Sequence, residues 1–289
     1  MAMTPISADS TPFIIMTWLE FESKFQPVAR LSQNVLLSED YAIKVLHSSS
    51  SDLKNELRVM SKLNSLCSET AIFGHGYGYI LSPEPPQRFQ DDEEWTQTRG
   101  HYAYLFMEPF ESSFFDLPDE PKTNEDYFFE ILIGLYYARQ AFSFCHWDIH
   151  QGQLMFNTFD VEQTRCYRIG DGDNAFYVTI SSCIEPKLLD FGKSIIDETG
   201  ITTEDLKQGA WKEPRWAKLW NKSDIYHLAL IFAQREHLSP QFCHFLEDCV
   251  LPTYKSSMYA TTFQRDYSTN YTNIEELLRV FFCQEPQSD

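Results

Sequence analysis

Two histidines and an aspartate stand close together in the stretch FCHWDIHQGQLMFN. His146 and His150 are four residues apart, which is the spacing of two zinc ligands on one face of a helix. A zinc protease motif of this kind has a glutamate directly after the first histidine, where this chain has Trp147. Gly152 also disfavours a helix that continues beyond His150. These residues therefore indicate a loop built around Asp148 rather than half of a zinc site.

Asp148 is one of three charged residues whose positions suit phosphoryl transfer. Lys44 lies in an expected strand, YAIKVL, and Asp190 directly follows a second expected strand in LLDFGKS. Taken singly, each has an ordinary interpretation as an exposed strand residue or a turn former. In this order, the strand lysine can hold nucleotide phosphates, the loop aspartate can accept the proton of a hydroxyl, and the last aspartate can hold Mg²⁺. Glu56, on the helix expected after Lys44, is available to pair with the lysine.

The elements that must position these residues begin with a strand-rich part of the chain. Residues 24–47 are rich in β-branched and apolar side chains that alternate, which predicts two or three antiparallel strands. Residues 50–66 place apolar side chains on one face and predict an amphipathic helix with a serine cap. The acidic, Pro-rich residues 82–100 predict a surface loop, and residues 101–110 a buried strand. The expected turns are near Ser32–Asn34 and Glu39–Asp40.

The rest of the chain is expected to be mainly helical. A long buried helix, capped by Thr123 or Asn124, is expected in TNEDYFFEILIGLYYARQAFSFC. A β-hairpin with the turn GDGDN is expected in RCYRIGDGDNAFYVTIS, and a separate short buried strand in PKLL, just before Asp190. The order of strands followed by helices predicts an α+β fold in two lobes, with a boundary near Phe110–Pro118. Two later helices are expected in NKSDIYHLALIFAQRE, capped by Ser223, and in TNIEELLRVFF, capped by Thr272 or Asn273.

Several stretches resemble, in order, the motifs of the protein kinase superfamily. AIKV is similar to the motif of the strand lysine, HWDIHQGQL to the catalytic loop, and LDFGKS to the metal-binding motif. FMEPF resembles the hinge between the lobes, KSDIYHLALIF the helix whose aspartate braces the catalytic loop, and NIEELLRVFF the last helix of the fold. The resemblance implies a bilobal protein-kinase-like fold: an N-terminal extension over residues 1–23, a small β-rich N-lobe over residues 24–110 and a larger, mainly α-helical C-lobe over residues 111–289.

The resemblance also implies ATP and Mg²⁺ as cofactors, a protein substrate, and a role for each matching residue. Asp148 would accept the hydroxyl proton, and Lys44 would be catalytic through the phosphates. Asp224 would brace the catalytic loop. The implied nucleotide-binding residues are Lys44, Glu56, Glu108 and Asp190, and the implied metal ligands are Asp190 and Gln153.

Within the superfamily the chain is most similar to the haspin-like atypical serine/threonine kinases. Their catalytic loop also has a histidine two residues and a glycine four residues after the aspartate, as His150 and Gly152 follow Asp148 here. Asp148 and Asp190 are 42 residues apart, farther than in ordinary kinases. The resemblance implies that CYRIGDGDNAFYVTISSC is the hairpin that haspin inserts between these two motifs.

The chain also departs from the kinase pattern. Residues 24–46 contain no glycine, so the Gly-rich loop over the phosphates is missing, and Trp147 replaces the arginine of the catalytic loop. Gln153 stands where an asparagine would hold the second metal, and Arg215 replaces the glutamate of the motif that closes the activation segment. The metal motif, LDFG, is nearer to ordinary kinases than to haspin. Two alternatives therefore stay open: a pseudokinase that binds nucleotide or a partner, and a small-molecule kinase of aminoglycoside-phosphotransferase type.

The composition limits the class of partner. The 289 residues carry a formal charge of −19, which disfavours nucleic acid and anionic membranes and favours a basic, histone-like protein substrate. The same charge also serves solubility. Seven cysteines without paired spacing, and an N-terminus without a signal-peptide pattern, predict an intracellular protein of the cytoplasm or nucleus.

Overall fold

The computed structural model divides into two compact units. The N-terminal unit comprises Met1–Cys67, Phe73–Phe110 and Asp190–Lys193, and the C-terminal unit comprises Ser68–Ile72, Glu111–Leu189 and Ser194–Asp289. The expected α+β class, with a β-sheet in the N-terminal region and helices in the C-terminal part, is confirmed. The structure describes residues 29–30, 35–38, 40–47, 51–82, 102–196, 216–250 and 274–283.

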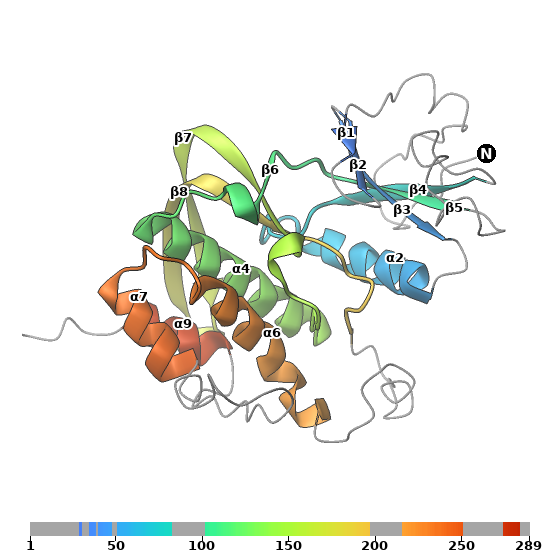
Figure 1. Cartoon of the computed structure of the whole chain (residues 1–289). Helices are drawn as coiled ribbons and strands as arrows, with labels where there is room; N and C mark the ends of the chain where they lie inside the picture. The colour runs from blue at the N-terminus through green and yellow to red at the C-terminus, as the bar shows by residue number, and fades with distance from the viewer. Residues whose placement is uncertain are drawn as a thin grey trace, which may run out of the picture. The chain divides into compact units, whose positions relative to one another are not determined.

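The N-terminal unit is built on a five-stranded antiparallel sheet with the strand order β1-β2-β3-β5-β4 (Figure 1). The two or three strands expected before residue 48 are confirmed as three, and the buried strand expected in residues 101–110 is confirmed as β5. The strands are β1 (Ala29–Arg30), β2 (Val35–Leu37), β3 (Ala42–His47), β4 (Gly76–Ser82) and β5 (Tyr102–Met107).

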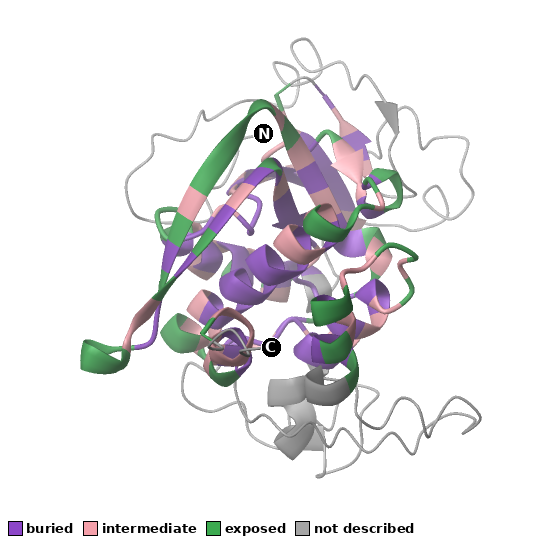
Figure 2. Cartoon of the chain, turned by 90° about the vertical axis from the view of Figure 1, so that its left-hand side faces the viewer, coloured by how far each residue is buried: buried purple, intermediate pink, exposed green. Residues whose placement is uncertain are grey.

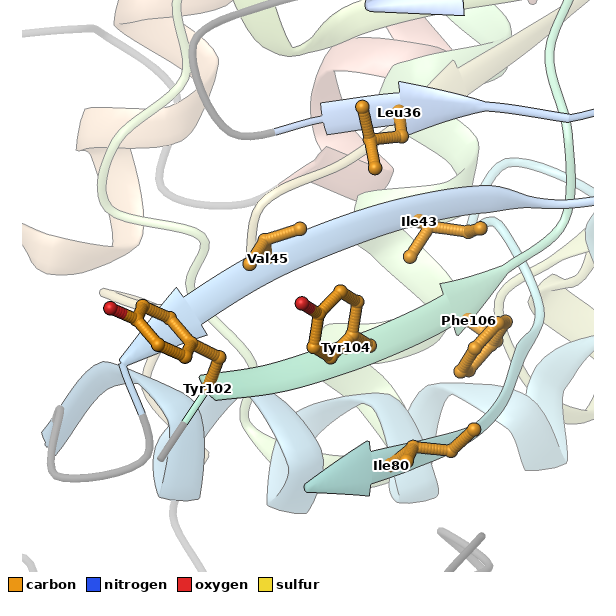
Figure 3. Packing of buried hydrophobic residues seen from close by; sticks show 7 residues of the cluster. All are labelled: Leu36, Ile43, Val45, Ile80, Tyr102, Tyr104 and Phe106. Atoms are coloured by element: carbon orange, nitrogen blue, oxygen red, sulfur yellow. The ribbon is translucent and has the colours of Figure 1, made fainter. Parts of the chain in front are cut away.

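One face of this sheet carries an apolar cluster that fixes the register of β3. Ile43 and Val45 point to the same face, where they pack with Leu36 of β2 and with side chains of β4 and β5 (Figure 3). Successive side chains of a strand point to opposite faces, so Lys44 lies on the other face. The cluster consists of Leu36, Ile43, Val45, Ile80, Tyr102, Tyr104 and Phe106.

Helix α2 (Ser51–Leu63) follows β3 and continues into the 3-10 helix η1 (Asn64–Leu66). Its buried side chains recur every three or four residues, as the amphipathic pattern predicted. Leu53, Val59, Met60 and Leu63 are apolar members of this buried face, and Glu56 lies among them. A carboxylate in such a position needs a cation or hydrogen-bond donors around it.

The C-terminal unit is organised around helix α4 (Pro121–Phe142), which contacts β8, α6 and α9 (Figure 1). Aromatic rings form much of this core: Phe128 lies 5.5 Å from Phe232 of α6 and 5.1 Å from Phe242 of α7, measured between ring centroids. Among the described helices, none is long and apolar enough to cross a membrane. The other helices of this unit are α6 (Trp216–Phe232), α7 (Pro240–His244), the π-helix η6 (Phe245–Val250), α9 (Ile274–Phe282), and the 3-10 helices η3 (Phe114–Asp116), η4 (Gln151–Gln153) and η5 (Gly172–Asn174).

A long two-stranded ribbon connects the two aspartate motifs. It consists of β7 (Leu154–Ile169) and β8 (Phe176–Leu188), and the short β6 (Ser112–Ser113) pairs with the start of β7. The hairpin turn expected at GDGDN is confirmed, and Gly170 and Gly172 adopt the positive φ values that such a turn requires. Much of β7 in the middle of the ribbon is exposed (Figure 2).

The ribbon corrects one sequence expectation. PKLL was predicted to be a separate short strand, but Pro186–Leu188 form the end of β8, and β7 begins directly after the Asp148 loop. The expected hairpin is therefore only the distal part of a longer ribbon. Its two base residues, Leu154 and Leu188, are paired.

Two expected helix caps are wrong. Helix α4 begins at Pro121 with Glu120 as its N-cap, because proline is already fixed in the φ that the first helical residue needs. Asn124 lies inside the helix, and Thr123 does so too. Ser223 also lies inside its helix, because α6 begins at Trp216.

Some expectations fall outside the described residues. These are the extension over residues 1–23, the turn at Ser32–Asn34, most of the acidic segment 82–100, Arg215, and the caps Thr272 and Asn273.

Candidate active site

Lys44, Glu56 and Asp190 form one charged cluster in the N-terminal unit. The Lys44 ammonium donates to both carboxylate oxygens of Glu56, at 3.0 and 2.9 Å, and to Oδ1 of Asp190 at 2.6 Å. The predicted ion pair between Lys44 and Glu56 is therefore confirmed. The Glu56 side chain is 0% exposed and that of Lys44 is 7% exposed, whereas that of Asp190 is 45% exposed. The cluster thus has a buried carboxylate that holds the lysine and a second carboxylate open to solvent.

Burial and charge act against each other in this cluster. Burial works to lower the pKa of Lys44, but the carboxylates of Glu56 and Asp190 outweigh it, so the pKa of Lys44 is raised. Burial also raises the pKa of Glu56, and the ammonium of Lys44 offsets this only in part. Lys44 consequently stays a cation, held by neighbours that are acidic.

Asp190 opens a segment, residues 190–192, that lies against α2. Its backbone φ is 67°, in the left-handed region that aspartate tolerates better than most residues. The Phe191 ring lies 6.1 Å from that of Phe73, and the Phe191 amide donates to Glu56. Asn55, which the sequence analysis did not single out, donates from Nδ2 to the carbonyl oxygen of Gly192 at 2.9 Å. An asparagine directly before the pairing glutamate of a helix was the only sequence signal for it.

Glu108 lies just after β5 and contacts His75. Its carboxylate accepts from the His75 amide at 3.1 Å, and its own amide donates to the His75 carbonyl at 2.8 Å. Burial lowers the pKa of His75, which the nearby Glu108 carboxylate opposes. The side chain of Glu108 therefore ties the end of β5 to the residue before β4.

The loop of Asp148 is held in the C-terminal unit by Asp224 of α6. Asp224, which is 0% exposed, accepts from the His146 amide at 2.7 Å and the Trp147 amide at 2.8 Å. Trp147 has a φ of 69°, an unusual conformation for a bulky side chain that neighbouring contacts must stabilise. The bracing role expected for Asp224 is confirmed by these two hydrogen bonds.

The side chains of His146 and His150 contact backbone groups. Nε2 of the buried His146 lies 2.9 Å from the carbonyl oxygen of Leu189, the residue before Asp190. Nδ1 of His150 accepts from the Gly152 amide at 3.1 Å and caps η4. Within the described residues no group of three or more potential metal-binding side chains occurs.

Asp148 and Gln153 lie side by side in this loop. Nε2 of Gln153 lies 3.4 Å from Oδ2 of Asp148, a long hydrogen bond. Gln153 is buried, and in the part of the chain that the structure describes its Oε1 has no hydrogen-bond partner. An amide oxygen left unpaired inside a protein is costly. It is also a ligand that Mg²⁺ accepts, as is a solvent-facing carboxylate such as that of Asp190. The residues present in each unit therefore fit a hard divalent cation.

Comparisons with known proteins add little to this geometry. No family model matches the chain, and no curated protein matches it either. A solved kinase domain from Plasmodium is similar with a TM-score of 0.43 and 15% identity, over 78% of this chain and 70% of that one.

The elements and contacts described above are consistent with a protein-kinase-like fold. A lysine on the third strand pairs with a glutamate on the following helix, which is the arrangement that kinases use in their β-rich lobe. The helical C-terminal part holds an aspartate in a loop after a long buried helix, and a second aspartate follows the ribbon.

Proposed function

We propose that this chain is an ATP-dependent kinase that transfers the γ-phosphoryl group of ATP to a protein hydroxyl. The observation that carries the proposal is the contact of one buried ammonium, that of Lys44, with both Glu56 and Asp190. A purely structural ion pair needs one partner. Here the fully buried carboxylate of Glu56 fixes the lysine. The carboxylate of Asp190 on the other side of the ammonium is exposed, so an anion from solvent can approach the lysine there.

Each residue of the N-terminal unit has a role in this proposal. Lys44 binds phosphate oxygens, and Glu56 keeps its stem from turning away. Asp190 presents its carboxylate to Mg²⁺. The metal, when bound with ATP, neutralises charge on the phosphates. Because Asp190 also contacts the Lys44 ammonium, its carboxylate and the phosphates would share that cation.

Asp148 and Gln153 of the C-terminal unit serve the same reaction in this proposal. Asp148 accepts the proton of the attacking hydroxyl and orients its oxygen. Gln153 offers Oε1 to the cation and, through Nε2, restrains Asp148. The two amide hydrogen bonds to Asp224 keep the loop rigid enough for this orientation.

The finer features of the proposal rest on the sequence and on single observations. The length of the ribbon between the two aspartates supports a haspin-like serine/threonine kinase, since that type has an inserted hairpin there. The charge of −19 supports a basic, histone-like protein substrate. The seven cysteines lack the paired spacing of a disulfide framework, which supports a reducing, intracellular setting in the cytoplasm or nucleus.

A pseudokinase is the second candidate, and two observations favour it. Gln153 is longer than the asparagine that kinases use here, and residues 24–46 lack the glycines that let a backbone approach phosphates. Such a protein would keep Lys44, Glu56 and Asp190 for nucleotide binding and would transfer little phosphate.

The experiment that tests the proposal separates binding from transfer. We expect Asp190→Ala to lose Mg²⁺-dependent ATP binding, because it removes the metal ligand, and Asp148→Ala to bind ATP like the parent but transfer no phosphate. Titration calorimetry with ATP and Mg²⁺, together with a transfer assay, measures both. Parent-like binding and activity in both variants would contradict these assignments, whereas binding without transfer in the parent would favour the pseudokinase.

A further inference from the structure

Asn55 holds the backbone of the metal-binding segment from the side of α2. Its Nδ2 donates to the carbonyl oxygen of Gly192 at 2.9 Å and lies 3.4 Å from that of Phe191. The side chain is half-buried, and both acceptors belong to the two residues directly after Asp190. A carboxamide has two N–H donors, so it can serve two neighbouring carbonyl groups without adding charge to an already acidic cluster.

Glu56, the next residue of the helix, complements this contact. Its carboxylate accepts from the Phe191 amide, while Asn55 donates to the carbonyls of Phe191 and Gly192. Two consecutive side chains of α2 therefore satisfy both the donor and the acceptor groups of the segment. The Phe191 ring packs near Phe73 and adds an apolar contact to the same segment.

The segment needs such support because of the conformation of Asp190. A left-handed backbone at a residue other than glycine is unfavourable, less so for aspartate, and persists only where surrounding contacts stabilise it. The contact of the Asp190 carboxylate with Lys44 cannot by itself fix the backbone, since a long lysine side chain follows a moving carboxylate. The Gly192 amide also donates to Oδ1 of Asp190, but at 3.5 Å this bond is long and lies within the segment itself. The hydrogen bonds to the carbonyls on the far side of Asp190 can fix the backbone.

We propose that Asn55 is a positioning residue that fixes the 190–192 segment so that the Asp190 carboxylate is presented to a Mg²⁺–nucleotide complex. This inference rests on the proposed function of Asp190 as the metal ligand. It adds that α2 positions two parts of the site: Glu56 holds Lys44 for the phosphates, and Asn55 holds the backbone of residues 190–192.

The test compares Asn55 with a matched asparagine in the same unit. Asn64 also clamps a backbone segment, because its Nδ2 donates to the Gly76 carbonyl at 2.7 Å and its Oδ1 accepts from the Gly76 amide at 3.0 Å. Asn64→Ala therefore removes comparable hydrogen bonds without touching the metal motif. Asn55→Ala removes the hydrogen bonds to the carbonyls of Phe191 and Gly192. Asn55→Asp keeps the shape of the side chain but places a carboxylate next to these two carbonyl oxygens.

The first readout is the gain in ADP affinity that Mg²⁺ provides, measured by calorimetry with Mg²⁺ and with EDTA. We expect both Asn55 variants to lower that gain by about two- to tenfold, the value of one or two net hydrogen bonds, while metal-free ADP affinity stays that of the parent. Asn64→Ala should keep the gain. An unchanged gain in Asn55→Ala, or an equal loss in Asn64→Ala, would overturn the assignment.

The second readout does not depend on nucleotide. Lys193 is exposed and directly follows the held segment, so trypsin can cut after it once the segment loosens. We expect mass spectrometry to show faster cleavage after Lys193 in Asn55→Ala than in the parent and in Asn64→Ala. If the parent binds no Mg²⁺–ADP, the proposed function fails. The cleavage rate alone then tests whether Asn55 holds the 190–192 segment, and equal rates in all three proteins would refute that role.

Discussion

Replacing Lys44 with methionine should lower the stability of the fold, because it leaves the buried carboxylate of Glu56 without its cation. Methionine keeps an apolar stem of similar length and removes the ammonium that contacts Glu56 at 2.9 Å and Asp190 at 2.6 Å. The two carboxylates then respond differently. Asp190 is 45% exposed and can turn to water, whereas Glu56 is 0% exposed and keeps only the Phe191 amide as a hydrogen-bond donor among those described above.

The magnitude follows from this difference in burial. Removing one partner of a buried ion pair costs about 3–5 kcal/mol, because the remaining charge is left without compensation. Lys122→Met is the matched control: that lysine also meets two carboxylates, those of Asp126 and Glu162, but it is 64% exposed. Exposed pairs contribute about 0–1 kcal/mol, so the control should be nearly neutral.

The cost should depend on pH, since Glu56 can take up a proton. Burial already raises its pKa above the ordinary value of 4.5, and loss of Lys44 removes the effect that lowers it. Between 4.5 and the raised pKa the folded state binds a proton that the unfolded state does not. Stability therefore falls as pH rises through this window, by at most about 1.4 kcal/mol per pH unit, and the variant should recover stability on acidification.

Urea unfolding followed by circular dichroism at several pH values measures these effects. We expect Lys44→Met to be the least stable variant at neutral pH, and the double variant Lys44→Met/Glu56→Gln to regain most of the loss, because its buried amide carries no charge. The reasoning is refuted if Lys44→Met costs no more than Lys122→Met, or if the double variant is no more stable than the single one.

Three further variants test other parts of the structure. Asp224→Ala should cost about 1.5–3 kcal/mol for each lost hydrogen bond to its carboxylate and speed hydrogen exchange at the Trp147 amide; unchanged exchange would contradict the bracing role. Burial raises the pKa of Glu130 in α4 to about 7 despite its contact with Arg165, so the parent should lose up to about 3 kcal/mol relative to Glu130→Gln as pH rises from 4.5 to 7; parallel stability curves would exclude this titration. Gln153→Ala should lower turnover about tenfold, or ~1.4 kcal/mol, at saturating Mg²⁺ while Gln153→Asn keeps it; parent-like turnover of the alanine variant would show that Gln153 is no ligand.

Much of the fold could be predicted because local signals agreed with the final structure. The alternating residues of β3 and the three-to-four-residue periodicity of α2 identify the two elements that bring Lys44 and Glu56 together. The order of the kinase-like motifs along the sequence then predicts that Lys44 and Glu56 form a pair. Asp224 was found in the same way, from its place in a helix after the metal motif.

The misses arise where tertiary contacts decide between local alternatives. Asn124 is a good cap by type, but its carboxamide bonds to Asp119 at 2.7 Å and to the His237 carbonyl at 2.8 Å, so it serves packing inside α4. The sequence predicted too short a ribbon, because the outer parts of β7 and β8 are stabilised by pairing between residues that lie far apart in the chain. Asn55 could not be found because its partners lie 136 and 137 residues along the chain, and no local pattern encodes them.

Transfer of labelled γ-phosphate from ATP to a histone or other basic-protein mixture tests the central claim most directly. The parent protein with Mg²⁺ should label the mixture, and Asp148→Asn, which keeps the shape of the side chain but cannot accept a proton, should not. Removal of Mg²⁺ by EDTA should also abolish labelling. Equal labelling by the parent and by Asp148→Asn would contradict the assignment of Asp148, and no labelling by either protein would contradict kinase activity toward basic proteins.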